Sequence, residues 1–250
     1  MADHDRTRTN RLDLELVDRG LARSRSLARK LVEQGIVQVD GRAATKASQS
    51  VPKDCEITLD EHTAWVSRAA HKLLGALDEL GWDRVPERTL DAGASTGGFT
   101  EVLLSRGAVE VHAVDVGHGQ MAQSLLDDPR VVAHEGLNLR HLALADVGGR
   151  PVDLAVCDVS FISLTLLLEP IFSVIAPGGK ALLMVKPQFE VGRRRLSSAG
   201  VVRDEQTRLE AVEAVCAAAR ELGWTDRWRS PSTLPGPAGN IEYFVLFERV

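Results

Sequence analysis

The sequence predicts a doubly wound α/β domain that follows a smaller α+β domain. Three observations support this prediction. From residue 88 onward, short apolar runs alternate with stretches of helical length, an order typical of a mostly parallel sheet covered by helices. Residues 11–62 have a different pattern, with two short helical repeats followed by a hairpin. The 250 residues provide enough chain for a core in each of two domains.

The smaller domain is predicted to contain two helices and a hairpin. Apolar residues between positions 12 and 17 form the first helix, which Gly20 closes. Ser24 is suited to cap a second helix, whose apolar residues recur at helical spacing until Gly35. Residues 36–39, the turn Asp40-Gly41 and a return segment then predict the hairpin.

A short connector at residues 63–66 leads into the larger domain, residues 67–250. Its Trp65 is expected to pack against a domain, because a large aromatic side chain is poorly suited to a free linker. A helix is predicted from residue 67 to about residue 80. Further helices are predicted at residues 100–106, 117–126, 161–175 and 205–222, and strands at residues 88–91, 109–114, 131–134, 153–157, 181–185 and 241–247.

Composition and charge bound the possible classes of protein. The net charge of −5 does not indicate a nucleic-acid-binding protein, so any basic surface must be local. The three cysteines are far apart and indicate reduced thiols in a cytoplasmic protein. Residues 1–10 are polar, carry charges of both signs and are predicted to be a flexible N-terminus, not a signal peptide. The most apolar stretch, residues 161–177, is interrupted by Glu169 and Pro170, which argues against a membrane span.

A glycine-rich loop, D-A-G-A-S-T-G-G-F-T at residues 91–100, joins the first strand of the larger domain to its helix. Glycines at such a turn let the backbone approach a ligand closely. The next strand ends in Asp115, where a carboxylate can bind the ribose hydroxyls of a nucleotide-type cofactor. The loop therefore predicts a cofactor site, although glycine-rich turns of this kind also occur without a ligand.

A basic patch is predicted in the smaller domain. Between positions 19 and 46 the positive residues outnumber the two acids, Glu33 and Asp40. Charged runs of this kind are usually solvated helix faces, and that interpretation stays open here. The positive residues are Arg19, Arg23, Arg25, Arg29, Lys30, Arg42 and Lys46.

Charged residues also stand where the strands of the larger domain end or begin. Asp158 and Lys186 each follow a predicted strand, and Glu242 opens the last one. Reactive groups collect at the carboxyl ends of strands in doubly wound sheets. Lys72 lies on the helix that enters the domain. Taken singly, each of these residues is equally explained as a solvated or paired surface charge.

The stretch from Arg11 to about Val51 resembles the alpha-L RNA-binding module of the ribosomal S-four type. The run L-A-R-S-R, the glycine after the second helix and the V-Q-V-D-G hairpin carry the resemblance. In that family the helices and hairpin bind folded RNA through phosphate contacts and shape. The resemblance implies RNA contacts by Arg11, Arg23, Arg25 and Lys46, each of which is also compatible with an ordinary surface position.

The larger domain resembles S-adenosylmethionine-dependent methyltransferases, and in particular the FtsJ-like ribose 2′-O-methyltransferases. Its motifs occur in order: S-R-A-A-H-K-L, the glycine loop, D-V-S-F-I-S, V-K-P-Q-F-E-V-G and P-G-P-A-G-N-I-E-Y-F. With the smaller domain, the match from Arg11 to Phe247 is close to the TlyA family of ribosomal RNA cytidine-2′-O-methyltransferases. This resemblance implies a Rossmann-like sheet with an antiparallel last strand, S-adenosylmethionine as cofactor, and methylation of cytidine ribose in 23S rRNA, in 16S rRNA or in both.

The resemblance also implies a catalytic tetrad of Lys72, Asp158, Lys186 and Glu242. A ribose hydroxyl must lose its proton as it attacks the methyl group. A lysine accepts that proton only if its pKa falls from about 10.4 towards neutrality, through burial or a nearby ammonium. Lys186 is the candidate base, with Lys72 lowering its pKa and stabilising the oxyanion. In the alternative, Lys186 stays charged and acts electrostatically, and in both cases Asp158 and Glu242 orient the lysines.

For the cofactor, the resemblance and the residue pattern agree on Gly93, Ser95, Phe99 and Asp115, with Asp158 as a further contact. Asn138 is a candidate for adenine, or equally a loop-capping residue. No metal is expected, because the departing group of a sulfonium needs no acid. The target cytidine is expected to flip out of the RNA helix. Residues expected to guide the RNA backbone are Arg68, Arg140 and the run Arg193-Arg194-Arg195.

Three departures from the family pattern stand out. Thr63 replaces a common linker arginine, Ala69 replaces a common glycine, and the sequence stops at Val250, where the longer form of the family adds a helix associated with the 16S target. A monomer acting on rRNA within a ribosomal subunit, away from membranes, is expected. The alternatives are a non-catalytic ribosome-assembly factor, a haemolysin, which lacks support from any export or membrane segment, and a small-molecule methyltransferase, which leaves the first domain without a role.

Overall fold

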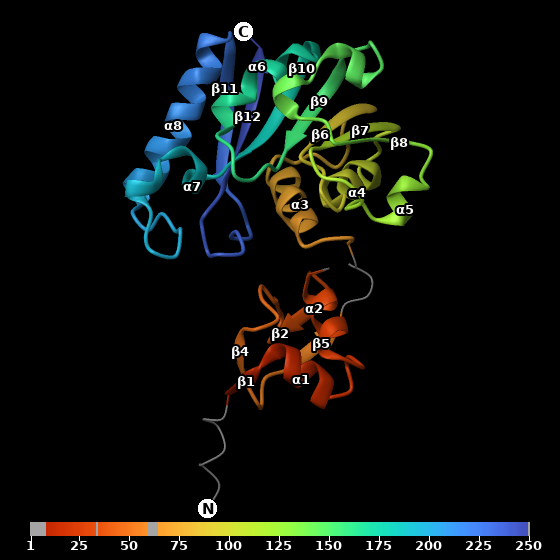
Figure 1. Ribbon diagram of the computed structural model, residues 1–250, viewed down its shortest axis with the longest axis vertical. Coiled ribbons are helices and arrows are strands. Elements are labelled where there is room, and N and C mark those ends of the chain that lie inside the picture. The colour runs from red at the N-terminus through yellow and green to blue at the C-terminus, as the bar shows by residue number, and fades with distance from the viewer. Residues whose placement is uncertain (1–8, 34, 60–64, 250) are drawn as a thin grey trace, which may run out of the picture. The chain divides into compact units, whose positions relative to one another are not determined.

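The computed structural model describes residues 9–33, 35–59 and 65–249. It divides into two compact units, Met1–Ala70 and His71–Val250 (Figure 1). Most of the expected flexible N-terminus, and the linker position Thr63, lie outside the described residues. No helix in the described ranges has both the length and the apolar character needed to cross a membrane.

The first unit packs two helices against short strands. Helices α1 (Leu12–Asp18) and α2 (Arg25–Glu33) contribute Leu12, Leu16 and Ala28 to its core. The Ser24 side chain accepts a hydrogen bond from the backbone N–H of Leu27 at 3.2 Å, which confirms the predicted cap. The strands are β1 (Thr9–Arg11) paired with β4 (Ser50–Pro52), and β2 (Val37–Val39) paired with β3 (Arg42–Ala43) and β5 (Ile57–Leu59).

The hairpin between β2 and β3 forms as predicted. Asp40 and Gly41 both have positive φ angles, 49° and 71°. Two positive φ values in a two-residue turn are typical of the type I′ geometry that suits the twist of a hairpin.

The second unit is a seven-stranded sheet with the order β11-β12-β10-β9-β6-β7-β8. The neighbours from β10 to β8 run parallel, and β12 runs antiparallel to both β10 and β11. This arrangement confirms the doubly wound class with an antiparallel last strand. The strands are β6 (Arg88–Ala92), β7 (Glu110–Asp115), β8 (Val131–Glu135), β9 (Val152–Cys157), β10 (Ile175–Val185), β11 (Trp224–Pro231) and β12 (Tyr243–Arg249).

Helices cover this sheet and close its core. Side chains of α6 (Leu168–Ser173) and α8 (Glu205–Glu221) join inward side chains of the central strands in one apolar cluster. Figure 1 shows α8 running beside β11. The remaining helices are α3 (Ala69–Glu79), α4 (Gly98–Ser105), α5 (Gln123–Leu126) and α7 (Pro187–Glu190), with 3₁₀ turns η2 (Leu139–His141), η3 (Leu144–Val147), η4 (Leu164–Leu166) and η5 (Arg193–Arg195).

Two predicted helices are shorter than expected. In place of a helix at 117–126, only α5 forms, because the Asp115 carboxylate accepts the backbone N–H of Gly117 at 2.7 Å and holds the preceding residues in a loop. The helix expected at 161–175 splits into η4 and α6, because Phe161 has a positive φ of 66° and Ser163 caps η4. Strand β11 was not predicted as a strand.

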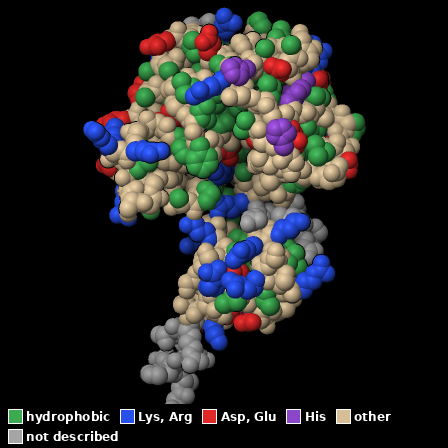
Figure 2. Space-filling model, in the orientation of Figure 1, with side chains coloured by type: hydrophobic (Ala, Val, Ile, Leu, Met, Phe, Trp, Pro, Cys, Tyr) green, Lys and Arg blue, Asp and Glu red, His purple; other side chains and the backbone are tan. Residues whose placement is uncertain are grey.

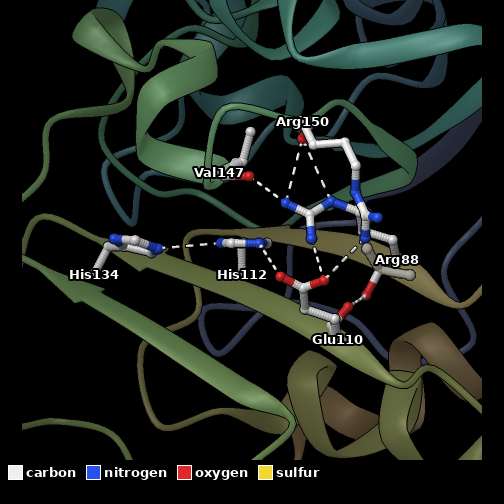
Figure 3. Close-up of polar contacts among 7 residues, drawn as sticks. Arg88, Glu110, His112, His134, Val147 and Arg150 are labelled. Carbon is white, nitrogen blue, oxygen red and sulfur yellow. Dashed lines mark hydrogen bonds and ion pairs between the residues drawn. The ribbon is translucent and has the colours of Figure 1, made fainter.

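A partly buried polar network ties together strands β6, β7 and β8 (Figure 3). Arg88 of β6 pairs with Glu110 of β7 and donates to the backbone carbonyls of Val147 and Arg150. Glu110 also contacts His112 Nε2 at 3.0 Å, and His112 Nδ1 lies 3.3 Å from His134 Nε2 in β8. The network fixes the η3 loop against the sheet, at the end opposite the predicted site.

Candidate active site

The four tetrad residues meet at one edge of the sheet. Asp158 follows β9 and Lys186 follows β10, so both lie where parallel strands present their carboxyl ends. Glu242 precedes β12, and this strand begins at the same edge because it runs antiparallel to β10. Helix α3 brings Lys72 to the group.

Two close ion pairs organise the tetrad. Lys72 Nζ lies 2.6 Å from Glu242 Oε2, and Lys186 Nζ lies 2.6 Å from Asp158 Oδ1. The second oxygen of Asp158 is 3.9 Å from Lys72 Nζ, so this carboxylate bridges both ammonium groups. Lys72, Lys186 and Glu242 are only 5%, 8% and 1% exposed. Charges this well buried persist because each has an opposite partner within contact distance.

Two further polar side chains complete the group, and neither was predicted from the sequence. Ser160 Oγ accepts a hydrogen bond from Lys186 Nζ at 2.9 Å. Gln188 Nε2 donates to Glu242 Oε1 at 3.1 Å, so each oxygen of Glu242 has a donor. Their positions two residues after Asp158 and Lys186, inside the motifs at these strand ends, were a usable signal.

The loop before β12 is shaped to admit Glu242. A Cβ at Gly236 would lie 2.6 Å from Glu242 Oε1, so the loop approaches the carboxylate more closely than any other residue permits. The buried Asn240 side chain anchors this loop by accepting from Val202 N at 3.0 Å and donating to Gly200 O at 3.1 Å. The loop that leads to Glu242 is therefore fixed by Asn240, and it passes close to the carboxylate at Gly236.

The glycine loop lies directly beside the tetrad. Gly93 has a φ of 89°, and a Cβ there would lie 2.9 Å from the carbonyl oxygen of Asp158. Gly97, with a φ of 94°, would place a Cβ 2.2 Å from Leu125 Cδ1. Both positions therefore need glycine for conformation and for space, and the loop packs tightly onto the segment after β9.

A cavity of about 490 Å³ opens between the glycine loop and that segment, a volume suited to a small-molecule cofactor. Five of the predicted cofactor residues line it. One of them, Asp115, accepts backbone N–H groups of Ser95 at 2.8 Å and Gly117 at 2.7 Å. The lining residues are Gly93, Ser95, Asp115, Val116, Gln120, Leu137, Asn138, Leu139, Asp158, Val159, Ser160, Phe161, Ile162 and Leu167.

Two predicted cofactor residues have other contacts. Phe99 is buried in α4 and stacks on Phe244 with ring centroids 6.0 Å apart, so it supports the loop from below and does not line the cavity. Asn138 lines the cavity and also caps η2, because its side chain accepts the backbone N–H of Arg140 at 3.0 Å. The capping interpretation of Asn138 is therefore confirmed, and its contact with adenine stays a prediction.

A buried acid lies under the glycine loop. Asp91, the last but one residue of β6, accepts a hydrogen bond from Thr100 Oγ1 at 2.7 Å. Burial raises the pKa of Asp91 to about 7, with the nearby carboxylates of Asp158 and Asp115 adding to the rise. Of these three carboxyl groups, Asp115 and Asp158 line the cavity, whereas Asp91 is fully buried and does not.

An exposed aromatic ring stands at the mouth of the cavity. Phe161 is 91% exposed and packs against Phe189, with ring centroids 5.3 Å apart. A positive φ is an outlier for a phenylalanine, and such outliers cluster at functional sites. The residue lies in the D-V-S-F-I-S motif, but its exposure could not be deduced from the sequence.

The predicted RNA-contacting residues lie on both units. In the first unit, Lys and Arg side chains crowd one face (Figure 2). Arg11, Arg25 and Arg29 surround the buried carboxylate of Asp13 at 2.9, 3.0 and 3.9 Å, which holds the pKa of Asp13 well below its usual range. Of the other predicted RNA-contacting residues, Arg23, Lys46, Arg140 and Arg193 are exposed. Arg68 donates a hydrogen bond to the backbone carbonyl of Thr45.

The arginine run after α7 is anchored by its last member. Arg195 donates to Thr207 Oγ1 at 2.9 Å and pairs with Glu210 at 2.6 Å, while Arg193 and Arg194 are exposed. Across the described ranges, no three His, Cys, Asp or Glu side chains gather in a group suited to a metal ion.

Known families match both units. Residues 65–249 match the FtsJ-like methyltransferase family, and residues 10–57 match the S4 domain. The sheet order and the cavity at the carboxyl ends of the strands agree with a methyltransferase fold.

Individual relatives cover between 73% and 97% of the chain. The 16S/23S rRNA (cytidine-2′-O)-methyltransferase TlyA of Mycobacterium tuberculosis H37Rv is 50% identical over 240 residues, 95% of this chain and 89% of that protein. The 23S rRNA (cytidine-2′-O)-methyltransferase TlyA of Campylobacter jejuni is 37% identical over 187 residues, 73% and 70% of the two chains. The solved structure of a proposed hemolysin from Streptococcus thermophilus has a TM-score of 0.74 at 35% identity, covering 97% and 89%.

Proposed function

The chain belongs to the TlyA family of FtsJ-like methyltransferases, and we propose that it transfers a methyl group from S-adenosylmethionine to the ribose 2′-hydroxyl of a cytidine in ribosomal RNA. The observation that carries this proposal is the buried cluster of Lys72, Asp158, Lys186 and Glu242 at the edge of the cavity. A hydroxyl nucleophile needs a group that receives its proton and stabilises its charge, and this cluster supplies both.

The residues around the cavity fit S-adenosylmethionine. The Asp115 carboxylate stands where ribose hydroxyls of a nucleoside bind, and Gly93 lines the same cavity. Apolar side chains such as Leu139 and Ile162 suit the adenine ring. When bound, S-adenosylmethionine supplies an electrophilic methyl group on a sulfonium. Loss of a neutral thioether requires neither a general acid nor a Lewis acid.

Lys186 is the residue that we assign to the reacting hydroxyl. Its Nζ donates to Ser160 Oγ and forms an ion pair with Asp158, and because an ammonium has three donors it keeps a donor for the 2′-oxygen. In that position Lys186 either accepts the proton or stabilises the developing oxyanion. Lys72 adds a second positive charge, and Asp158 holds both ammonium groups in register.

Glu242 and Gln188 are assigned to the support of Lys72. Glu242 accepts from Lys72 with one oxygen and from Gln188 with the other, so the carboxylate cannot rotate without losing a hydrogen bond. Fixing a catalytic ammonium in this way reduces the reorganisation needed in the transition state.

The exposed ring of Phe161 is suited to stack on the target base. A ribose within a helix cannot reach a buried lysine, so the nucleotide must leave its stack. Flipped bases commonly stack on aromatic side chains. Phe161 provides such a ring at the mouth of the same cavity that would hold the cofactor.

The finer points of substrate and setting follow from the same proposal. We expect a target in 23S rRNA, with 16S rRNA as the second candidate, read within a ribosomal subunit by a monomer in the cytoplasm. The basic face of the first unit and the exposed Arg140 and Arg193 would hold the RNA backbone. Such contacts position the RNA, and shape supplies the selectivity.

Mass-spectrometric mapping of 2′-O-methylcytidine tests this function. Ribosomal RNA from cells with the protein should contain a methylated cytidine that is absent without it, and the purified protein should restore it from tritiated S-adenosylmethionine. Unchanged maps in both 16S and 23S rRNA, together with inactive purified protein, would contradict the proposal and favour a non-catalytic assembly factor.

A further inference from the structure

Two segments beside the tetrad are joined at a second point away from it. The segment 158–164 follows β9, and the segment 186–190, which contains α7, follows β10. Near the reacting groups they are joined through Lys186, which contacts Asp158 and Ser160 at 2.6 and 2.9 Å. Further along both segments, the second junction is made by Glu190.

The Glu190 carboxylate uses both oxygens for this junction. Its Oε2 accepts a hydrogen bond from Ser163 Oγ at 2.5 Å, and its Oε1 accepts the backbone N–H of Leu164 at 2.8 Å. Ser163 in turn caps η4 and lies 2.7 Å from Thr165 Oγ1. The side chain of Glu190 is partly buried, and charge-assisted hydrogen bonds of this kind are the stronger ones in proteins.

Only two residues lie between the two junctions, and one of them is Phe161. Its φ of 66° is unfavourable for a phenylalanine, and such a conformation persists when the surrounding contacts hold it. Ser160 is held on one side by Lys186, and Ser163 on the other by Glu190. Phe189, the ring against which Phe161 packs, immediately precedes Glu190 in α7.

We propose that Glu190 is a positioning residue that holds Phe161 in its outward orientation, ready to receive the target base. The inference rests on the function proposed above. Glu190 does not line the cavity and has no contact with the tetrad lysines in the described structure, so it acts through the segment that carries Phe161.

A double-mutant cycle tests this role. The kcat/KM for ribosomal RNA is measured at saturating S-adenosylmethionine for Phe161→Ala, Glu190→Ala and the double variant, all at a temperature where each is folded. Phe161→Ala should lower kcat/KM about 10-fold or more, since stacking of one base contributes that much to binding. Glu190→Ala should lower it severalfold alone, but should have little further effect when Phe161 is already alanine.

A merely structural Glu190 gives a different result. Its loss would then lower kcat/KM by the same factor in both backgrounds, and this result overturns the proposal, as does a Glu190→Ala variant with unchanged kcat/KM. Glu169→Ala is the matched control, because this exposed glutamate lies in the neighbouring α6 and should leave kcat/KM unchanged.

A second variant removes the same contact from the other side. Ser163→Ala deletes the hydroxyl that donates to Glu190 and changes the volume little, so it serves if Glu190→Ala does not fold. It should show the same non-additivity with Phe161→Ala. Failure of the proposed function would appear as a wild-type protein without methyl transfer, whereas failure of the present inference would appear as an active wild type with multiplicative effects.

Discussion

At the scale of single residues, the two lysines of the tetrad have different surroundings. Lys186 contacts a carboxylate and a hydroxyl beside the cavity, while Lys72 is paired at 2.6 Å with a nearly inaccessible glutamate. These surroundings support our assignment of the contact with the reacting hydroxyl to Lys186 and of a fixed positive charge to Lys72.

We predict that Lys186→Ala abolishes methyl transfer to ribosomal RNA while S-adenosylmethionine still binds. Loss of a group that receives the proton and stabilises the oxyanion commonly lowers kcat by about 100-fold or more. Tritium transfer measures the rate, and calorimetry measures cofactor affinity. Arg203→Ala, a change at an exposed residue outside the tetrad, provides a control with nearly wild-type turnover. Substantial turnover by the Lys186 variant would remove this residue from the mechanism.

Asp91 leads to a second prediction, on stability. Its pKa is about 7 in the folded protein and about 4 in an unfolded chain, so the folded state binds more protons between these values. Asp91 therefore favours the folded state below about pH 4, and that contribution is lost as pH rises to about 7. Asp91→Asn keeps an acceptor for Thr100 but does not ionise. The unfolding temperature of this variant minus that of wild type should therefore increase from pH 5 to pH 8.

Calorimetric or circular-dichroism melts across that pH range measure the difference. Asp153→Asn, at an exposed position in β9, is the matched control and should give a curve parallel to wild type. A wild-type curve that also runs parallel to that of Asp91→Asn would show that Asp91 is already ionised in the folded protein.

The site residues divide into those that the sequence could indicate and those that it could not. Asp158, Lys186 and Asp115 stand at strand ends, where local pattern alone gives their place in the fold. Ser160 and Gln188 lie in motifs at strand ends, which indicates that they are near the site, but their partners lie 26 and 54 residues away, and no local pattern reveals those contacts. The burial of Phe99 beneath the loop is likewise a result of packing against β12.

At the scale of elements, the network across β6, β7 and β8 makes stability depend on pH. Burial lowers the pKa of His112, and the Arg88 charge lowers it further, against the opposing effect of Glu110; burial also lowers the pKa of His134, which Asp146 opposes. Both histidines therefore favour the folded state when neutral. Their contribution is complete above the unfolded pKa of about 6.5 and is lost as pH falls below it.

We predict that His112→Gln flattens this pH dependence. Glutamine can still contact Glu110 but does not titrate. From pH 7 to pH 5, the unfolding temperature of the variant should fall by about 2 °C less than that of wild type. Thermal melts resolve this difference. His141→Gln, an exposed histidine in η2, is the control and should follow wild type. Identical slopes for wild type and His112→Gln would mean that the network does not take up protons in this range.

Elements were predictable where one physical cause fixed them. The runs of β9 and of the second half of β10 are apolar because both faces of the sheet are covered there, and the sequence shows it. Strand β11 lies at the sheet edge and carries Asp226, Arg227 and Arg229, so its composition resembled a loop although its backbone pairs with β12. The helix expected at 117–126 does not form over its whole length, because the Asp115 carboxylate accepts the backbone N–H of Gly117.

At the scale of the whole molecule, the charge is divided unevenly. The chain carries a net charge of −5, yet one face of the first unit is crowded with Lys and Arg side chains. Part of this positive charge is neutralised by Asp13, which pairs with Arg11 and Arg25. Arg23 and Lys46 are exposed and do not pair with Asp13. Because Asp13 does not neutralise their charges, they are the better test of phosphate binding.

We predict that Arg23→Gln and Lys46→Gln each weaken binding to ribosomal RNA without changing kcat at saturating RNA. Each phosphate contact releases a counterion, so the slope of log affinity against log salt should fall by about 1 per substitution. Filter binding to ribosomal subunits between about 50 and 300 mM salt measures the slope. Lys53→Gln removes the same charge from an exposed position of the same unit that is not among the predicted RNA-contacting residues. If Lys53→Gln weakens binding as much as the other two, the RNA senses only the total charge of the unit, and no defined contact face exists.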